Sequence, residues 1–500
     1  MTSTPDPVDL LRSLTQLGSH ADLETKEKFC QTFLPIPEHA RAYDLDVVLV
    51  VGSRGAGKTA LFNAVIKYGL YNVISRYSTQ QRLDGPDYQK ILWFQGYPRN
   101  RFPETRSLDA YFSQSKEPLR DAHDIWFSYL TKLLYDEFDD ESKTTLKELI
   151  KCEEGAAQKN VDAFRRAREG PTLAIDRLDE RLQSEGRFFI IGYDALDSIG
   201  GVIPSITKQA IQGLIAFWAS YTRRWPRIRA KLFIRTDLYD RYARGGGADI
   251  SKLASNRAEI IWSDKNLYAM MIKRIANSSP ELFHYCEEYG VKFKTDDILS
   301  YIPIINDSSD AKSIIHTMLG KYMGTSHKKG LTDKWILTHI RDGHKQAFPR
   351  PLIRLVEDAA NYQLHSNQDL KYPLLIGSIS LRNALETVST EYVRQSKEDE
   401  FPWLYGLEKR LKGETIPFNR SSLEKKLRDH WNEPWGENLE IESPMDSPRE
   451  LIEHLIELGI FRLRTDERID VPDLYLFGLG LKRRGGVKSG KKASSSKNRR

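Results

Sequence analysis

Long apolar runs, closely spaced cysteines and a signal-peptide pattern are all missing from this 500-residue sequence. No apolar run approaches the roughly 18 residues needed to cross a bilayer. The first residues, MTSTPDPVDLLRSLTQ, have acids and prolines where a secretory signal needs a basic and then an apolar segment. The three cysteines, Cys30, Cys152 and Cys286, are far apart, which is typical of free thiols in a reducing compartment. These absences predict a cytoplasmic protein that does not enter a membrane.

Acidic residues are missing from the last nineteen residues, KRRGGVKSGKKASSSKNRR, which hold nine Lys or Arg. Without these nine positive charges the net charge of the chain falls from +6 to −3. A segment rich in Gly, Ser and Lys cannot pack a core, so 481–500 is predicted to be a basic disordered tail. Two interpretations stay open, an arm for nucleic acid or another anionic partner and a solubilising end.

Apolar strands alternate with helices through the first half of the sequence. Helices are predicted at 119–138 and 205–225, and strands at 46–51, 90–97, 187–197 and 230–237. This alternation predicts an α/β fold with a parallel sheet and helices on both faces. After about residue 250 the strands thin out, and 263–365 is predicted to be mostly helical.

The segment before the tail has the element order of a winged helix. SSLEKKLRDHW (421–431) predicts a short helix with a serine cap. SPRELIEHLIELG (447–459) predicts a second one, with Ser447 at the N-cap, Pro448 in the first turn and Gly459 just past the end. IFRLRTDERIDVPDLY (460–475) predicts a two-stranded ribbon around TDER. We therefore expect a winged-helix domain here.

The sequence GSRGAGKT (52–59) fits G-x-x-x-x-G-K-[ST] at every fixed position, between a predicted strand and a predicted helix. Its glycines let the backbone turn and bring N–H groups against phosphate oxygens. Lys58 reaches the β and γ phosphates, and Thr59 supplies a hydroxyl to Mg²⁺. The predicted contacts to a nucleoside triphosphate are Gly52, Ser53, Arg54, Gly55, Ala56, Gly57, Lys58, Thr59 and Ala60.

The strand FFIIGYDALD (188–197) ends in two acids. A carboxylate at the carboxyl end of a parallel strand faces the ligand site of such a sheet. Asp194 is therefore predicted to hold Mg²⁺ with Thr59. Asp197 is predicted to polarise the attacking water or tighten the metal site. The alternative is that both acids cap the next helix.

Motifs of several P-loop classes are absent. The sequence has no N-K-x-D segment of GTPases, no L-S-G-G-Q segment of ABC-type ATPases and no D-E-A-D or D-E-A-H box of helicases. The order GSRGAGKT, FFIIGYDALD, KLFIRTD, an arginine before AEIIW and then FPRPLIRLVEDAA resembles the AAA+ ATPases over roughly residues 40–480. It is most similar to the branch that holds the origin-recognition-like and the STAND ATPases. The segment YDALD resembles the Walker B motif of the STAND ATPases, in which a second acid follows three residues later. The resemblance implies ATP and Mg²⁺ as ligands and ATP hydrolysis as the activity.

The resemblance also implies roles for residues outside the two Walker motifs. Arg235 or Thr236, in the position of sensor 1, would contact the γ-phosphate or the attacking water, and a packing or capping role is the alternative. Arg257 would be an arginine finger acting on a neighbouring subunit, and a plain surface arginine is the alternative. Arg350 would be the sensor 2 of a lid helix, with Arg354 as the alternative.

Two departures from the family pattern bear on the rate of hydrolysis. The Asp-Glu pair of AAA+ Walker B motifs is replaced by Asp194–Ala195, and the sensor 1 asparagine is absent from LFIRTD. We therefore expect slow turnover and a switch in place of a motor.

These motifs predict five segments. They are an N-terminal helical segment at 1–40, a P-loop ATPase core at 41–262, a helical lid at 263–365, a winged-helix domain at 366–480 and the basic tail at 481–500.

Three functions are compatible with the sequence. The first is an ATP-dependent, self-associating switch that controls a protein effector, since bacterial relatives of this kind often belong to anti-phage defence systems. The second is a DNA-associated ATPase of the initiator or transposition-helper type, which would use the winged helix and the tail. The third is a nucleotide-dependent scaffold without significant hydrolysis.

Overall fold

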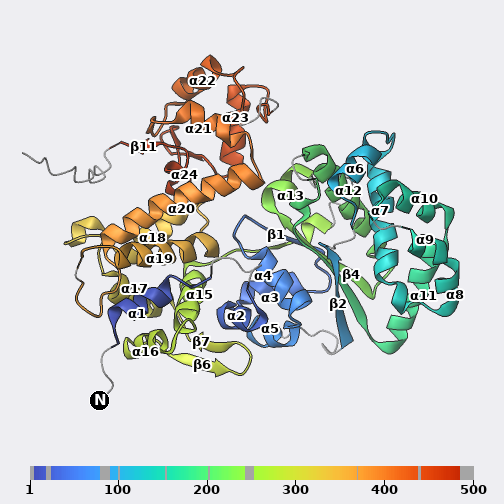
Figure 1. Ribbon diagram of the computed structural model, residues 1–500, viewed down its shortest axis with the longest axis horizontal. Helices are drawn as coiled ribbons and strands as arrows, with labels where there is room; N and C mark the ends of the chain where they lie inside the picture. Colours follow the sequence, from blue (N-terminus) through green and yellow to red (C-terminus); the bar gives the residue numbers. More distant parts are fainter. Residues whose placement is uncertain are drawn as a thin grey trace, which may run out of the picture. The chain divides into compact units, whose positions relative to one another are not determined.

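The computed structural model describes residues 5–18, 24–78, 90–98, 102–152, 155–200, 203–242, 253–368, 370–436 and 441–484. The chain forms two compact units, coloured along the sequence in Figure 1. The core unit comprises Leu17–Ala311 and Phe348–Arg350, and the C-terminal unit comprises Met1–Gln16, Lys312–Ala347 and Pro351–Arg500. Residues 243–252 and the predicted tail from residue 485 onward lie outside the described residues. The five predicted segments stay a prediction.

One five-stranded parallel sheet, in the order β2-β3-β4-β1-β5, forms the centre of the core unit. Its register pairs Gly52 with Arg235 and Tyr193 with Leu232. The carboxyl ends of β1, β3 and β4 therefore lie along one edge, and the predicted α/β class is confirmed. The strands are β1 (Leu49–Gly52), β2 (Ile91–Tyr97), β3 (Phe188–Tyr193), β4 (Ile228–Arg235) and β5 (Ala258–Glu259).

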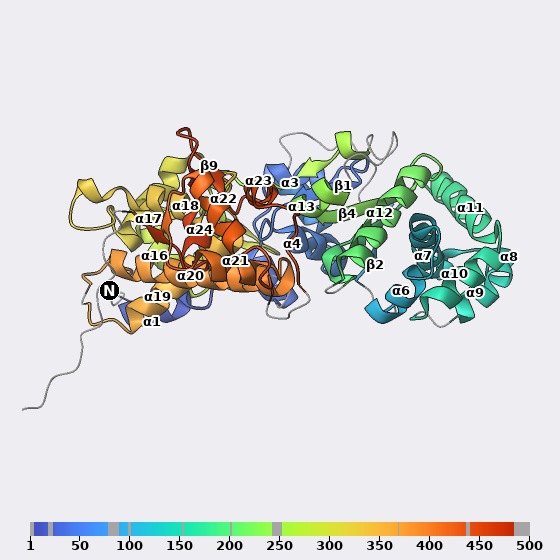
Figure 2. The same cartoon turned by 90° about the horizontal axis from the view of Figure 1, so that it is seen from above.

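Helices cover both faces of this sheet, as Figures 1 and 2 show. On one face α7 (Pro118–Leu133) and α12 (Pro204–Tyr221) share an apolar core with alternate residues of β3 and β4. The other face carries α4 (Lys58–Phe62), whose Phe62 meets Phe233 of β4 edge to face, with ring centroids 5.9 Å apart. Beside α4 lie α3 (Pro37–Tyr43) and α5 (Tyr71–Ser78). The largest buried aromatic residues of the α7–α12 core are Trp126, Phe127, Phe217, Trp218 and Trp225.

The connection from β2 to β3 is a long helical insertion that includes the helix predicted at 119–138. Its members pack around α7, and Arg165 joins two of them by donating to Asp121 (2.6 Å) and Asp124 (2.8 Å). Besides α7 it contains α6 (Thr105–Phe112), α8 (Asp140–Thr145), α9 (Lys147–Lys151), α10 (Ala157–Arg166) and α11 (Gly170–Glu185).

A β-hairpin interrupts the region that was predicted to be mostly helical. After α15 (Asp264–Ala276) and α16 (Pro280–Glu288), strands β6 (Phe293–Asp296) and β7 (Ser300–Pro303) pair antiparallel. Tyr301 stacks on Phe283 of α16 with centroids 3.9 Å apart, so aromatic packing holds the hairpin against the helix. The alternating pattern of VKFKTDD was the signal for this strand.

The C-terminal unit is mainly helical, and none of the helices in the described part of the chain is long and apolar enough to span a membrane. Its longest helix, α20, was not predicted. The unit contains α1 (Pro7–Leu14), α18 (Thr332–Ile340), α20 (Ser378–Asp399), α21 (Leu404–Leu411), α22 (Arg420–Asp429), α23 (Pro448–Glu457), α24 (Asp473–Leu476) and most of α17 (Ser308–Leu319) and α19 (Pro349–Leu364).

The helices and ribbon predicted for a winged helix are present in the predicted order. α21 is followed by β8 (Thr415–Ile416), α22 and α23, and then by the hairpin of β9 (Arg462–Leu463) and β10 (Ile469–Asp470). The Ser447 hydroxyl caps α23 as predicted. The serine cap predicted for α22 is wrong, because Asn419 is the N-cap and its side chain accepts from the Ser421 amide. β8 also pairs with β11 (Lys482–Arg483).

Lys231 of β4 is fully buried, and its ammonium group donates to the carbonyl oxygens of Asp44 and Val47. Desolvation lowers the pKa of Lys231 to about 7, and the same cause lowers the pKa of buried Lys273 to about 7. Since an unfolded chain keeps lysine charged up to about pH 10.4, the unfolded state binds more protons between these values, and stability rises with pH.

We expect Lys231 alone to raise the free energy of unfolding by on the order of 2 kcal/mol between pH 7 and pH 9. Urea unfolding of the wild type and of Lys231→Met at both pH values measures this. The variant should lose about half of the rise, since Lys273 contributes the remainder. If the free energy of unfolding rises as much in Lys231→Met as in the wild type, the lowered pKa of Lys231 does not cause the rise.

Candidate nucleotide-binding site

The predicted phosphate loop lies between β1 and α4, at the carboxyl edge of the sheet. Gly55 and Gly57 have φ angles of +76° and +100°, which glycine adopts without strain. Gly57 directly precedes α4, so the chain turns sharply into that helix. A Cβ atom at Gly52 would stand 3.3 Å from the Cβ atoms of Ala56 and Ile260. The shape of the loop therefore depends on glycine at all three positions.

Lys58, the first residue of α4, folds back onto this loop. Its ammonium group donates to the carbonyl oxygens of Gly52 (2.9 Å) and Ser53 (3.1 Å). Desolvation lowers the pKa of Lys58, while the charge of Asp194 opposes that shift. The side chain is thus a half-buried cation held inside the loop.

Asp194 follows β3 directly and is 4% exposed. The side chain of Thr59, at the start of α4, lies near this carboxylate and lowers its pKa. Burial raises the pKa of Asp194, and the neighbouring Thr59 side chain and the Lys58 charge only partly offset this. The next residue, Ala195, has φ +52°, a left-handed conformation that is unusual for a residue with a Cβ. The structure therefore brings the two predicted magnesium ligands together.

Arg235, at the end of β4, joins two carboxylates of the same edge. Its guanidinium contacts Asp197 at 3.2 Å and makes a two-pronged pair with Asp237 at 3.0 and 2.9 Å. Its side chain is only 8% exposed, so the pair with Asp237 is largely shielded from water. Thr236 begins α13 (Thr236–Tyr242) and is half-buried. Asp194, Asp197 and Arg235 all act on the pKa of Lys58, which places these predicted residues in one electrostatic cluster.

The other two predicted arginines differ in their surroundings. Arg257 precedes β5 and is held within its own chain, where it donates to Glu259 (2.6 and 2.9 Å) and to the Ala254 carbonyl (3.1 Å). Arg350 is the second residue of α19 and belongs to the core unit with the phosphate loop. The alternative, Arg354, belongs to the C-terminal unit and pairs with Asp358 at 3.2 Å.

Two residues beside the loop were not predicted. The Trp262 indole donates to the Ala56 carbonyl at 2.8 Å, which supports the loop from the segment between β5 and α15. The ring of His39 meets Trp262 edge to face, and its buried ring nitrogens have no hydrogen-bond partner among the described residues. Burial lowers the pKa of His39 to about 3, so this imidazole is neutral. Trp262 ends the quoted AEIIW strand and was the available signal, whereas His39 had none.

The residues present suit a nucleoside triphosphate with Mg²⁺. A hydroxyl and a carboxylate, the oxygen ligands that Mg²⁺ prefers, meet at Thr59 and Asp194. The raised pKa of Asp194 means that its negative charge is under-compensated, and a divalent cation would compensate it. Of the remaining loop residues, Ala56 is buried, Ser53, Arg54 and Ala60 are half-buried, and Thr59 is exposed.

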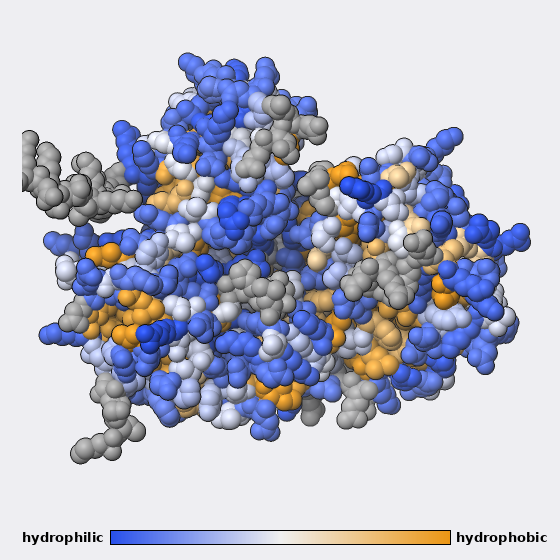
Figure 3. Space-filling view, viewed as in Figure 1, coloured by the Kyte–Doolittle hydropathy of each residue, from blue (hydrophilic) through white to orange (hydrophobic). Residues whose placement is uncertain are grey.

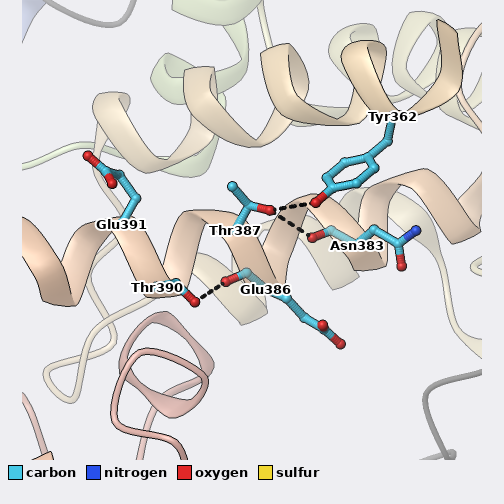
Figure 4. A pocket seen from close by; sticks show the side chains of 6 residues that line it. All are labelled: Tyr362, Asn383, Glu386, Thr387, Thr390 and Glu391. Carbon is cyan, nitrogen blue, oxygen red and sulfur yellow. Dashed lines mark hydrogen bonds between the residues drawn. The ribbon is translucent and has the colours of Figure 1, made fainter. Parts of the chain in front are cut away.

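A groove of about 360 Å³ lies in the C-terminal unit and contains none of the predicted site residues. Figure 4 shows its lining on α19 and α20: Tyr362, Asn383, Glu386, Thr387, Thr390 and Glu391. Its hydroxyl groups are already bonded: those of Tyr362 and Thr387 pair at 2.9 Å, and Thr390 donates to the Glu386 carbonyl. This groove is therefore not part of the candidate nucleotide site.

Comparisons with known proteins do not assign a family. No protein-family model and no curated protein matches the chain. Among solved structures, the chain is similar to the Aeropyrum pernix ORC2 protein in its ADPNP–ADP complexes, with 13% identity over 87% of this chain and 85% of that chain and a TM-score of 0.28. It is also similar to Cdc6p from Pyrobaculum aerophilum, with 11% identity over 86% of each chain and a TM-score of 0.27. Similarity at this level decides nothing about function, which must be argued from the residues of this chain.

Proposed function

We propose that this protein is an AAA+-type ATP-binding switch that hydrolyses ATP slowly. One observation carries the proposal: the buried carboxylate of Asp194, at the end of β3, lies close enough to Thr59 and Lys58 at the start of α4 for both to lower its pKa. Beside it lies a lysine whose partners are only carbonyl oxygens. A cation with such neutral partners can exchange them for phosphate oxygens, which bind it more strongly.

Each residue of the site has a definite task in this proposal. Lys58 leaves the carbonyls of Gly52 and Ser53 and binds the β and γ phosphates. Thr59 and Asp194 hold Mg²⁺, which neutralises charge on the phosphates when it is bound. Asp197, which Arg235 contacts at 3.2 Å, orients the attacking water. Since Ala195 offers no second carboxylate next to Asp194, hydrolysis is slow.

The switch itself depends on the two outer arginines. Arg350 shares the core unit with the phosphate loop, whereas Arg354 belongs to the C-terminal unit, which favours Arg350 as the residue that responds to the γ-phosphate. Arg257 must leave Glu259 before it can act on a neighbouring subunit. Because an ion pair of this kind, half exposed to water, costs only about 1 kcal/mol to open, assembly can release it.

Self-association is tested through the concentration dependence of hydrolysis. If Arg257 acts in trans, the rate of phosphate release per chain rises with chain concentration in the wild type and stays flat and low in Arg257→Ala. Arg223→Ala, which removes an exposed arginine at the end of α12, is the matched control and should behave like the wild type. A rate per chain that is independent of concentration in the wild type would contradict the finger. Absence of phosphate release in a single turnover would favour the scaffold.

The biological setting rests on the sequence resemblance alone. It suggests a cytoplasmic protein that controls an effector, as in anti-phage defence systems of bacteria. An effector gene beside that of this chain would support this setting.

A DNA-associated ATPase is the second candidate, favoured by the basic exposed side of α22 with Lys425 and Arg428. Against it, the solvent side of α23 carries Glu450, Glu453 and Glu457, which would repel phosphates. Titration with duplex DNA at several salt concentrations, with and without residues 485–500 so that β11 is kept, separates the two. Binding that weakens with salt in the full chain supports this candidate, and its absence in both forms removes it.

A further inference from the structure

Gly192 of β3 lies where the helix after the phosphate loop meets the sheet. A Cβ atom on Gly192 would stand 1.9 Å from Cδ1 of Ile66 and 3.1 Å from Cε2 of Phe62. The φ angle of Gly192 is not positive, so the backbone conformation does not require glycine there. The residue is glycine because the helix lies against β3 at that point.

Gly192 points to the same side of the sheet as Asp194. Successive residues of a strand alternate between faces, so positions 190, 192 and 194 share one face. Ile191 and Tyr193 belong to the apolar core with α7 and α12, which identifies the opposite face. The residue that lets the helix approach and the residue that meets Thr59 are therefore two apart on the same face.

The helix is irregular at the contact. After α4 the chain forms one π turn, η1 (Asn63–Lys67), in which the Tyr68 amide donates to the Asn63 carbonyl at 2.9 Å. Such turns are rare and frequent at functional sites. Ile66 belongs to this turn, and Phe62 is the residue just before it. The irregular stretch therefore packs against Gly192 through both side chains.

We propose that Gly192 is a positioning residue of the magnesium site. By admitting Ile66 at van der Waals distance, it sets how closely α4 approaches β3, and so whether the Thr59 hydroxyl and the Asp194 carboxylate can hold one Mg²⁺ together. A side chain at 192 pushes the helix outward and separates the two ligands. This inference rests on the proposed nucleotide site.

The test compares the affinity for a non-hydrolysable ATP analogue with Mg²⁺ and with EDTA. The ratio of the affinity with Mg²⁺ to the affinity with EDTA should be roughly 10-fold smaller in Gly192→Ala than in the wild type. This is the usual cost of disturbing a residue that orients a metal ligand. Its affinity in EDTA should fall by much less than the Mg²⁺ gain does, because Lys58 stays tied to the loop through the Gly52 and Ser53 carbonyls even where the helix shifts. Gly192→Ala/Ile66→Ala, which removes the obstructing methyl groups, should restore most of the gain.

Gly213→Ala is the matched control. Gly213 of α12 is as tightly packed, with a Cβ there 2.4 Å from that of Ala122, but it lies on the opposite face of the sheet. This variant should lose stability and keep the wild-type Mg²⁺ gain. If Gly192→Ala fails to fold, Ile66→Phe crowds the same contact from the helix and should lose the gain.

Three results would overturn the inference: a wild-type Mg²⁺ gain in Gly192→Ala, an equal loss in Gly213→Ala, or no restoration by the double variant. In each case the wild type still shows Mg²⁺-dependent binding. If the wild type itself shows none, the proposed nucleotide site fails instead.

Discussion

Lys58→Ala is expected to weaken ATP binding by about 100-fold, or roughly 2.7 kcal/mol. The ammonium group of Lys58 now donates to two neutral carbonyls, and in the proposed complex it binds charged phosphate oxygens. Hydrogen bonds between charged groups contribute about 1.5–3 kcal/mol each, so one or two of them account for this loss. Fluorescence titration with a labelled ATP analogue measures it.

The control for this variant is Lys67→Ala. Lys67 ends the π turn after α4, is exposed, and lies over the ring of Tyr68 at 5.2 Å from its centroid. Its removal changes the net charge equally, so ATP affinity should stay within about twofold of the wild type if position matters more than charge. Equal affinities of Lys58→Ala and the wild type would refute the assignment of the loop.

Asp194→Asn is expected to slow ATP hydrolysis by at least about 100-fold, since metal stabilisation of the transition state amounts to several kcal/mol. The variant should also lose the Mg²⁺ dependence of nucleotide binding. Because burial raises the pKa of Asp194, the neutral amide removes a poorly solvated charge. The nucleotide-free variant should therefore be at least as stable as the wild type in urea, which separates a functional loss from misfolding.

Asp197→Asn distinguishes the two acids after β3. Asp197 is half-exposed and pairs with Arg235, so its proposed role is to orient water. Its variant should hydrolyse ATP slowly but keep the Mg²⁺-dependent gain in affinity. If instead Asp197→Asn loses that gain and Asp194→Asn retains it, the two roles are reversed.

Residues close together in the sequence explain what could be predicted. The strand, glycine loop and helix from 47 to 62 and the strand that ends at Asp194 are local patterns, and both lie where the sequence indicated. The parallel arrangement followed from the alternation of strands and helices. The cap of α23 at Ser447 was also a local signal.

Contacts between distant residues account for what was missed. The approach of Ile66 to Gly192 joins segments about 125 residues apart, and the support of Ala56 by Trp262 joins segments over 200 residues apart. Neither contact leaves a periodicity in the sequence. The β6–β7 hairpin was not predicted because its alternating segments are only four residues long and lie within a region of helical periodicity.

The central claim, that the phosphate loop and Asp194 form one magnesium–ATP site, is tested most directly by calorimetric titration of the full-length wild-type chain with a non-hydrolysable ATP analogue. The account predicts one bound nucleotide per chain and a clear gain in affinity with Mg²⁺ over EDTA. Absence of binding, or binding with the same affinity in both conditions, would contradict it.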